Sequence, residues 1–214
     1  MLRGVIFDMD GVLVDSEEFI CRAAIAMFAE HGVRVAPEDF RPFVGTGENR
    51  YLGGVAEKHG FKLDIERDKA RTYALYGEMI KGRLRPLPGA REFTAECRRR
   101  GLKTALATSA DTIKMTLSLG EIGLPEATFN AIVTGSEVAR KKPAPDIFLL
   151  AAARMSLAPA ECLVVEDAVN GVAAARAAGA KCLALLTTFP AEKLSGADFL
   201  APDLAAVPPA ALNW

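Results

Sequence analysis

The segment Val5-Ile6-Phe7-Asp8-Met9-Asp10-Gly11 decides which fold this chain is expected to adopt. Three apolar residues, typical of a buried strand, lead directly into two aspartates and then into a glycine that permits a sharp turn. Side chains two apart in a strand point to the same face, so both carboxylates would reach one side unless the chain leaves the strand between them. Two acids there suit a hard cation, and one of them could be a nucleophile. A strand followed by an ordinary Asp-Gly turn explains the segment equally well.

Two hydroxyl residues end a second predicted strand. The apolar run Lys103–Ala107 leads into Thr108 and Ser109, and a helix is predicted to begin at Asp111. Hydroxyls and free backbone amides at the junction between a strand and a helix can bind an oxyanion. Ordinary N-capping of that helix would also explain Ser109 or Asp111.

A lysine and two further acids follow later in the chain. Lys142 ends a lysine pair and is followed by two prolines that fix the backbone, although solvated surface charge is an alternative explanation for such a pair. The apolar strand Leu163–Val165 ends in Glu166 and Asp167. Ligands bind at the carboxyl ends of the strands in open α/β sheets, so we expect these residues to meet there with Asp8. Acids, a hydroxyl and one lysine are what magnesium-assisted phosphoryl transfer needs.

The ordered set of these motifs resembles the haloacid dehalogenase superfamily of phosphotransferases. The four family motifs correspond to Asp8-Met9-Asp10-Gly11, Thr108-Ser109, Lys142-Pro143 and Glu166-Asp167. The resemblance covers nearly the whole chain and is closer to the β-phosphoglucomutase-like branch, which carries a helical cap between the first two motifs. The segments around Gly45-Thr46-Gly47-Glu48 and Tyr51-Leu52-Gly53-Gly54 are similar to the phosphatase-like domain of plant and algal suppressor-of-quenching proteins.

This resemblance implies a role for each motif residue. Asp8 would attack phosphorus and become an aspartyl phosphate, while Asp10 would protonate the leaving oxygen and later deprotonate water. Thr108, Ser109 and Lys142 would bind the phosphoryl oxygens, with Lys142 chosen over its neighbour because the family lysine directly precedes proline. Magnesium is the implied cofactor, and its implied ligands are Asp8, the backbone carbonyl of Asp10, Glu166 and Asp167.

The resemblance also separates the candidate reactions. The dehalogenases of the family lack an acid at the position of Asp10, so dehalogenation fits poorly. The mutases carry a histidine in the first cap helix and basic groups in the cap loop, where this chain has Ile20, Val44 and Glu48. We therefore expect a magnesium-dependent phosphatase that hydrolyses a small phosphate monoester. The alternatives are a sugar-phosphate mutase and a regulatory or interaction domain of a larger protein with weak activity.

The rest of the chain predicts an α/β fold with an inserted helical domain. Helical spacing without any strand signal predicts an all-helical cap over residues 16–83. After Gly89 helices alternate with strands, and the first strand completes a Rossmann-like parallel sheet of five strands. The core would comprise residues 1–15 and 84–214, and the Ala- and Pro-rich segment Ala201–Ala211 is expected to pack loosely.

Composition limits the partners and the compartment. A hydrophobic content of 50% is ample for a buried core, and a net charge of −1 gives no broad attraction to nucleic acid or membrane. No apolar stretch is long enough to span a bilayer, and we expect no targeting peptide because the first strand begins close to Met1. Four cysteines without a C-x-x-C pair indicate a reducing compartment. We expect a soluble, monomeric domain in the cytoplasm, or in the chloroplast stroma if the likeness to suppressor-of-quenching proteins holds.

Overall fold

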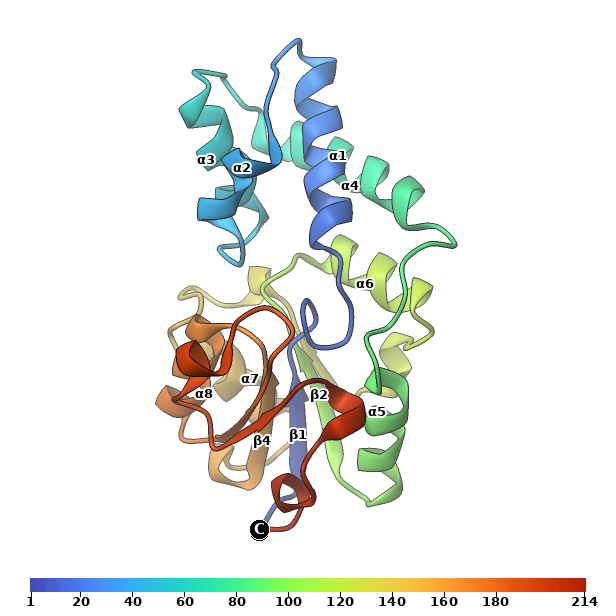
Figure 1. Cartoon of the computed structure of the whole chain (residues 1–214), viewed down its shortest axis with the longest axis vertical. Helices are drawn as coiled ribbons and strands as arrows, with labels where there is room; N and C mark the ends of the chain where they lie inside the picture. The colour runs from blue at the N-terminus through green and yellow to red at the C-terminus, as the bar shows by residue number, and fades with distance from the viewer.

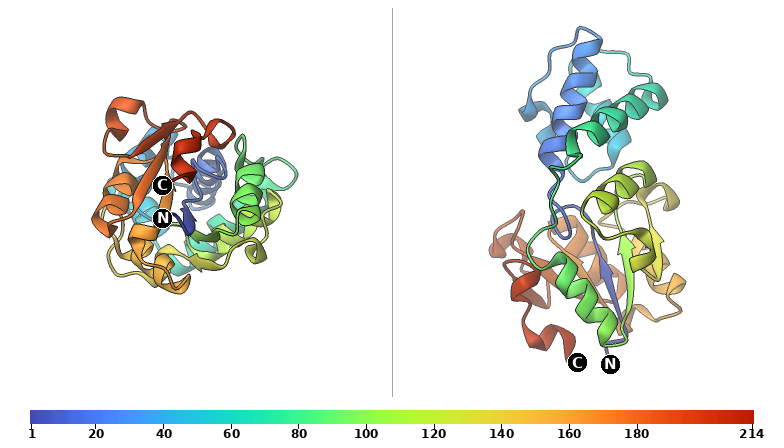
Figure 2. Two further views of the ribbon diagram at one scale, coloured as in Figure 1. Left: turned by 90° about the horizontal axis from the view of Figure 1, so that it is seen from below. Right: turned by 90° about the vertical axis from the view of Figure 1, so that its right-hand side faces the viewer.

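The computed structural model describes all residues from Met1 to Trp214 and divides into two parts (Figure 1). A sheet with helices on both faces forms the core, and a group of helices stands above the carboxyl ends of its strands. The two termini lie together at the opposite end of the core (Figure 2), where the N–H of Leu2 donates to the carbonyl of Trp214 over 3.0 Å. None of the helices has the length and apolar character needed to cross a membrane.

Six parallel strands form the sheet, in the order β3-β2-β1-β4-β5-β6. The strands are β1 (Gly4–Phe7), β2 (Lys103–Ala107), β3 (Ala131–Val133), β4 (Cys162–Glu166), β5 (Lys181–Leu185) and β6 (Phe199–Ala201). The direction in which strands are added reverses between β1 and β4, and at such a point the following loops diverge and leave a crevice at the carboxyl edge. The α/β class expected from the sequence is confirmed.

The prediction of five strands is wrong, because a sixth strand pairs at the edge of the sheet. β6 has only three residues and aligns with β5, with Phe199 opposite Leu183. A strand this short shows no measurable alternation in sequence, whereas the open edge of β5 offers backbone groups that it can satisfy. The expectation of a loosely packed segment after it is also wrong, since Ala201, Leu204 and Ala211 are buried.

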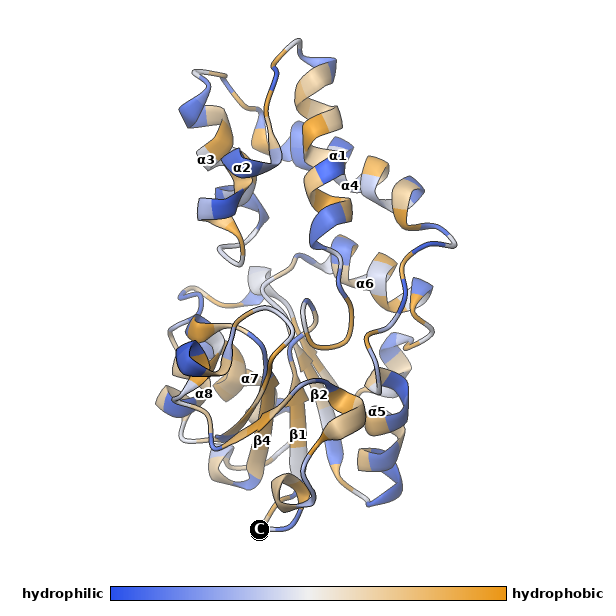
Figure 3. Ribbon diagram, viewed as in Figure 1, coloured by the Kyte–Doolittle hydropathy of each residue, from blue (hydrophilic) through white to orange (hydrophobic).

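Helices cover both faces of the sheet. One face carries α5 (Ala90–Arg99) and α6 (Thr112–Glu121), and the other carries α7 (Asp146–Arg154) and α8 (Val169–Ala178). Val5 and Phe7 of β1 belong to the apolar cluster on the α5 side, whereas Ile6 belongs to the cluster on the α7 side. Burial on both faces explains why the strands are continuous apolar runs, visible in orange in Figure 3.

Four α-helices and no strand lie between β1 and α5, which confirms the helical insertion. They are α1 (Glu17–Glu30), α2 (Pro37–Phe40), α3 (Glu48–Lys58) and α4 (Ile65–Ile80). We call this group the cap. Within it α1 packs against α4, and α4 also contacts α6 of the core, where the hydroxyls of Tyr76 and Ser118 are hydrogen-bonded over 2.7 Å. The cap is therefore held on the core by packing as well as by its two connections.

The two connections between cap and core run side by side. Val14 forms an isolated antiparallel bridge with Pro86, and the N–H of Leu87 donates to the carbonyl of Leu13 over 2.9 Å. Because of this pairing, the chain leaves the core for the cap and returns from it at the same place, beside the carboxyl edge of the sheet.

We expect Gly89→Ala to destabilise the protein by more than about 1–3 kcal/mol, the usual cost of placing a residue with a Cβ in the left-handed region. Gly89 has a φ of +78°, and an added Cβ would also overlap the backbone of Leu204 and Ala205. Urea unfolding followed by circular dichroism measures the loss. Gly101→Ala is the matched control, because Gly101 has a φ of +74° but no atom within 4 Å of the added Cβ. Equal destabilisation by the two variants would show that the overlap with Leu204 and Ala205 does not contribute to the loss of stability at Gly89.

Candidate active site

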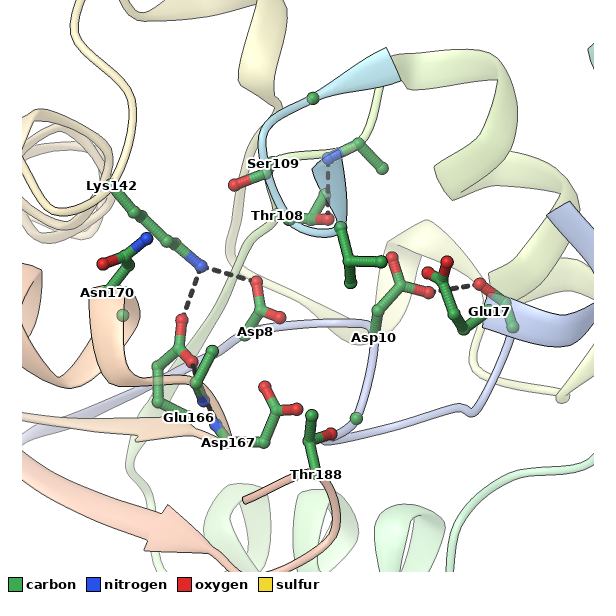
Figure 4. Close-up of a pocket in the computed structure, with 18 of the residues that line it drawn as sticks. Asp8, Asp10, Glu17, Thr108, Ser109, Lys142, Glu166, Asp167, Asn170 and Thr188 are labelled. Atoms are coloured by element: carbon green, nitrogen blue, oxygen red, sulfur yellow. Dashed lines mark hydrogen bonds and ion pairs between the residues drawn. The ribbon is translucent and has the colours of Figure 1, made fainter. Parts of the chain in front are cut away.

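A cavity of about 390 Å³ lies between the carboxyl ends of the strands and the cap. Core residues that follow β1, β2 and β4 form one wall, and residues of α1 and of the loop before α3 form the other (Figure 4). The wall includes every residue that the sequence motifs single out, namely Asp8, Asp10, Thr108, Ser109, Lys142, Glu166 and Asp167. Residues more than 150 positions apart along the chain thus share one cavity because neighbouring parallel strands end at the same edge.

Three carboxylates converge on the core side of this cavity. One oxygen each from Asp8, Glu166 and Asp167 lies within 4.8 Å of the others, and all three residues are buried. Asp8 follows β1 directly, and its N–H donates to the carbonyl of Val165 in β4 over 3.0 Å. Glu166 is the last residue of β4, so the pairing of β1 with β4 brings the three acids together. We call these three residues the acidic cluster.

The chemistry of the acidic cluster fits a hard divalent cation. Desolvation on burial raises the pKa of Asp8 and also that of Asp167, and the charge of Glu166 raises both further. A bound cation would offset this repulsion and hold the carboxylates ionised. Oxygen is the only donor type that the three residues offer, which favours magnesium over zinc.

Lys142 supplies positive charge to the acidic cluster. Its Nζ lies 2.6 Å from Asp8 Oδ1 and 2.7 Å from Glu166 Oε1 (Figure 4). Burial lowers the pKa of Lys142, but the charges of Asp8 and Glu166 raise it overall. The other oxygen of Glu166 accepts hydrogen bonds from the backbone N–H groups of Asp167 and Ala168, at 2.9 and 3.0 Å. Lys142 is therefore fixed beside Asp8, as a phosphate-binding cation would need to be.

The two hydroxyl residues lie at the end of β2. Thr108 is buried, its N–H continues the sheet by donating to Val133, and its Oγ1 accepts a hydrogen bond from the N–H of Ala110 over 3.1 Å. Ser109 is half-buried and lines the cavity. Asn170, at the start of α8, also lines the cavity, although no sequence motif singled it out for a role.

Asp10 is not one of the three clustered carboxylates. Its Oδ1 accepts a hydrogen bond from the hydroxyl of Ser16, and its Oδ2 lies 2.8 Å from Lys114 Nζ. Lys114 belongs to α6, is 4% exposed, and lies 3.8 Å from Glu48 Oε1 at the start of α3. Of Asp10, only the backbone carbonyl therefore remains a candidate ligand for a metal ion bound at the acidic cluster, as the family resemblance implies.

Sequence reasoning missed Lys114. Burial lowers the pKa of Lys114, but the charges of Asp10 and Glu48 raise it overall. The helical spacing of α6 is a signal that could have revealed it: Lys114 lies on the same buried face as Met115 and Leu119. A lysine on an apolar helix face is rarely buried without a charged partner, so this position predicts a nearby acid.

The capping role considered for Asp111 is wrong, whereas the surface role holds for one residue of the lysine pair. Asp111 occupies the N-cap position of α6 but makes no capping hydrogen bond there; it forms an ion pair of 2.7 Å with Lys69 of the cap. Lys141 is exposed and donates to backbone carbonyls, so the surface explanation holds for it and not for Lys142.

The cap presents apolar and acidic side chains to the cavity. Ile20, Phe43 and Val44 line it, together with two acids, Glu17 and Glu48. Burial raises the pKa of both acids. The basic residue that the cap contributes to the wall is Arg41, which is exposed and lies 3.9 Å from Glu38.

Comparison with known proteins gives matches along most of the chain. Residues 2–179 match the family model described as haloacid dehalogenase-like hydrolase. The protein SUPPRESSOR OF QUENCHING 1, chloroplastic, of Arabidopsis thaliana is 45% identical over 193 residues, which are 87% of this chain but only 18% of that protein. The phosphorylated carbohydrates phosphatase of Thermotoga maritima is 32% identical over 83% of this chain and 82% of its own length.

Two solved structures have the same arrangement of core and cap. CbbY from Rhodobacter sphaeroides in complex with phosphate is 28% identical and superposes with a TM-score of 0.87 over 96% of both chains. CbbY in complex with xylulose-(1,5)bisphosphate, also 28% identical over 96% of both chains, superposes with a TM-score of 0.86.

Proposed function

The chain belongs to the haloacid dehalogenase-like hydrolases, in the branch of CbbY and β-phosphoglucomutase, and we propose that it is a magnesium-dependent phosphatase acting on a small phosphate monoester. One observation carries the proposal. Asp8, the first residue after β1, lies 2.6 Å from Lys142 and within the acidic cluster at the edge of a cavity. A nucleophile, a fixed cation and a candidate metal site in one place are the parts that phosphoryl transfer requires.

Binding of the phosphoryl group depends on charge. A carboxylate and an anionic phosphate repel each other, so Asp8 can attack only where positive charge offsets the repulsion. Lys142 provides one such charge, and the hydroxyls of Thr108 and Ser109 would donate to the phosphoryl oxygens. Magnesium held by Asp8, Glu166, Asp167 and the Asp10 carbonyl would supply the remaining positive charge and polarise the phosphoryl group.

The reaction we propose has two steps. In the first, a carboxylate oxygen of Asp8 bonds to phosphorus, the bond between phosphorus and the ester oxygen breaks, and Asp10 gives its proton to that oxygen. In the second, Asp10 takes a proton from water, the water oxygen attacks phosphorus, and the bond to Asp8 breaks to release inorganic phosphate. Asp10 thus acts as acid and then as base, and it ends each cycle in its starting form.

The cap lining supports a monoester over a bisphosphate. A second phosphate would meet the acidic side chains of Glu17 and Glu48, while Lys114 is already paired with Asp10 and Glu48. Arg41, the basic residue of the cap wall, is exposed and lies beside Glu38. Ile20 and Val44 offer no hydrogen bond to such a group. We therefore propose water as the usual acceptor of the phosphoryl group, and a small phosphorylated carbohydrate or related alcohol as the substrate.

Inorganic phosphate should accumulate when the purified protein is incubated with magnesium and a panel of sugar and polyol monophosphates. The matched blank is the Asp8→Asn variant under the same conditions. Isomerisation of a sugar monophosphate with little phosphate release would replace the phosphatase proposal with the mutase alternative. Turnover no faster than the blank across the whole panel would favour an interaction or regulatory domain instead.

We propose a chloroplast location on one similarity alone, that to the Arabidopsis protein whose name describes it as chloroplastic. Because the chain matches only 18% of that relative, membership of a larger protein is part of the same proposal. Fractionation of plant or algal cells, with an antibody raised against this chain, would locate the protein and give the size of the native polypeptide. A signal confined to the cytoplasmic fraction would rule out the chloroplast location.

A further inference from the structure

We propose that Lys114 is a positioning residue that holds the carboxylate of Asp10 toward the leaving oxygen, with Glu48 of the cap as its second partner. The inference rests on the proposed function, because it concerns the proton that Asp10 gives in the first step. It assigns a role to a buried lysine that belongs neither to the acidic cluster nor to the phosphate-binding motifs.

The carboxylate of Asp10 needs an external tether. Asp10 lies beyond the end of β1, directly before Gly11, and its side chain is 34% exposed. Lys114 holds one oxygen at 2.8 Å, and the hydroxyl of Ser16 donates to the other. Proton transfer to a leaving oxygen requires a particular carboxylate oxygen at hydrogen-bond distance, so a group that fixes the carboxylate contributes directly to rate.

The burial of Lys114 requires charged partners for its ammonium group. A lysine that is 4% exposed loses most of its hydration, and that loss must be offset by charged partners. The charged partners within reach are Asp10 on the core side and Glu48 on the cap side. Removal of the ammonium would leave Asp10 held by Ser16 alone.

Glu48 connects this contact to the cap. It is 8% exposed, its Oε1 lies 3.8 Å from Lys114 Nζ, and its Oε2 is buried without a hydrogen-bond partner. Because Glu48 begins α3, its carboxylate reaches Lys114 only while the cap sits on the core as it does here. The ion pairs therefore make the position of Asp10 depend on the position of the cap.

The test compares two substrates that differ in their need for a proton. Cleavage of an alkyl phosphate requires protonation of the leaving oxygen, whereas 2,4-dinitrophenyl phosphate has a leaving group that departs as an anion. General acid catalysis contributes about 10²–10⁴-fold. We expect Lys114→Met to lower kcat/KM about 100-fold or more for the best sugar monophosphate and less than about 5-fold for the dinitrophenyl ester. The ratio kcat/KM is used because it covers substrate binding and the first step and excludes hydrolysis of the intermediate.

Four further variants complete the design. Lys114→Arg keeps the charge and should recover part of the loss in kcat/KM for the sugar phosphate. Lys62→Met, at an exposed lysine, should leave kcat/KM unchanged for both substrates. Glu48→Gln should lower activity on the sugar phosphate less than Lys114→Met does, and the double variant should lose less than the product of the two effects. If Lys114→Met does not fold, Lys114→Gln takes its place under the same criterion.

The results separate this inference from the proposed function. Equal losses on both substrates, or no loss on either, would overturn the role of Lys114 while the phosphatase proposal stands. Multiplicative effects of the Lys114 and Glu48 changes would overturn the link to the cap. Failure of the unmodified protein to hydrolyse either substrate faster than Asp8→Asn would overturn the proposed function, and this inference with it.

Discussion

Asp8→Asn should lower turnover of a phosphate monoester by about 10⁴-fold, equivalent to about 5 kcal/mol in the activation barrier. Asparagine keeps the shape of aspartate but carries no negative charge, so the nucleophile of the first step is lost while the side chain keeps its size. Phosphate release under saturating substrate and magnesium measures the effect. Turnover within about tenfold of the unmodified protein would show that Asp8 is not the nucleophile.

Two controls make this result specific. Asp64→Asn applies the same chemical change at the N-cap of α4, where asparagine caps as well as aspartate, and should leave turnover unchanged. Mass spectrometry of the protein quenched during turnover should detect one covalent phosphoryl group on the unmodified chain and none on Asp8→Asn. A phosphoryl group on the variant would place the nucleophile elsewhere.

A chelator should abolish hydrolysis, and magnesium should restore it. The acidic cluster brings three carboxylates within 4.8 Å, and Lys142 contacts two of them. Without a divalent cation the net charge beside the phosphoryl group stays negative, which opposes both substrate binding and attack. Phosphate release in the chelator, followed by titration with magnesium, measures the dependence. Full activity in the chelator would exclude a metal-dependent first step.

Metal binding should also be visible without turnover. A cation bound to the folded state alone stabilises it, by about 2.7 kcal/mol at a concentration 100 times its dissociation constant. We expect magnesium to raise the unfolding temperature of the unmodified protein and not that of Asp167→Asn, which removes one carboxylate of the cluster. An equal rise in both would place the metal outside the acidic cluster.

Local sequence patterns were sufficient for most of the architecture. Continuous apolar runs marked β1, β2 and β4 because both faces of a parallel sheet are buried, and helical spacing marked the inserted helices. β6 was not predicted, because a strand of three residues shows no sequence pattern of its own and forms through its pairing with the edge strand β5. The segment that follows β6 was also mispredicted, because its buried residues contact parts of the core that are distant in the sequence.

The sequence by itself determined that Asp8, Glu166 and Asp167 would meet, because parallel strands end at one edge and each acid lies at or just beyond the end of a recognisable strand. Only the tertiary structure decided the partners of Asp10. Lys114 is 104 positions away on a helix whose rotation about its axis is set by packing against the core and cap. A strand fixes the position of the residue at its end, whereas a side chain on a helix meets its partner only after the layers have packed.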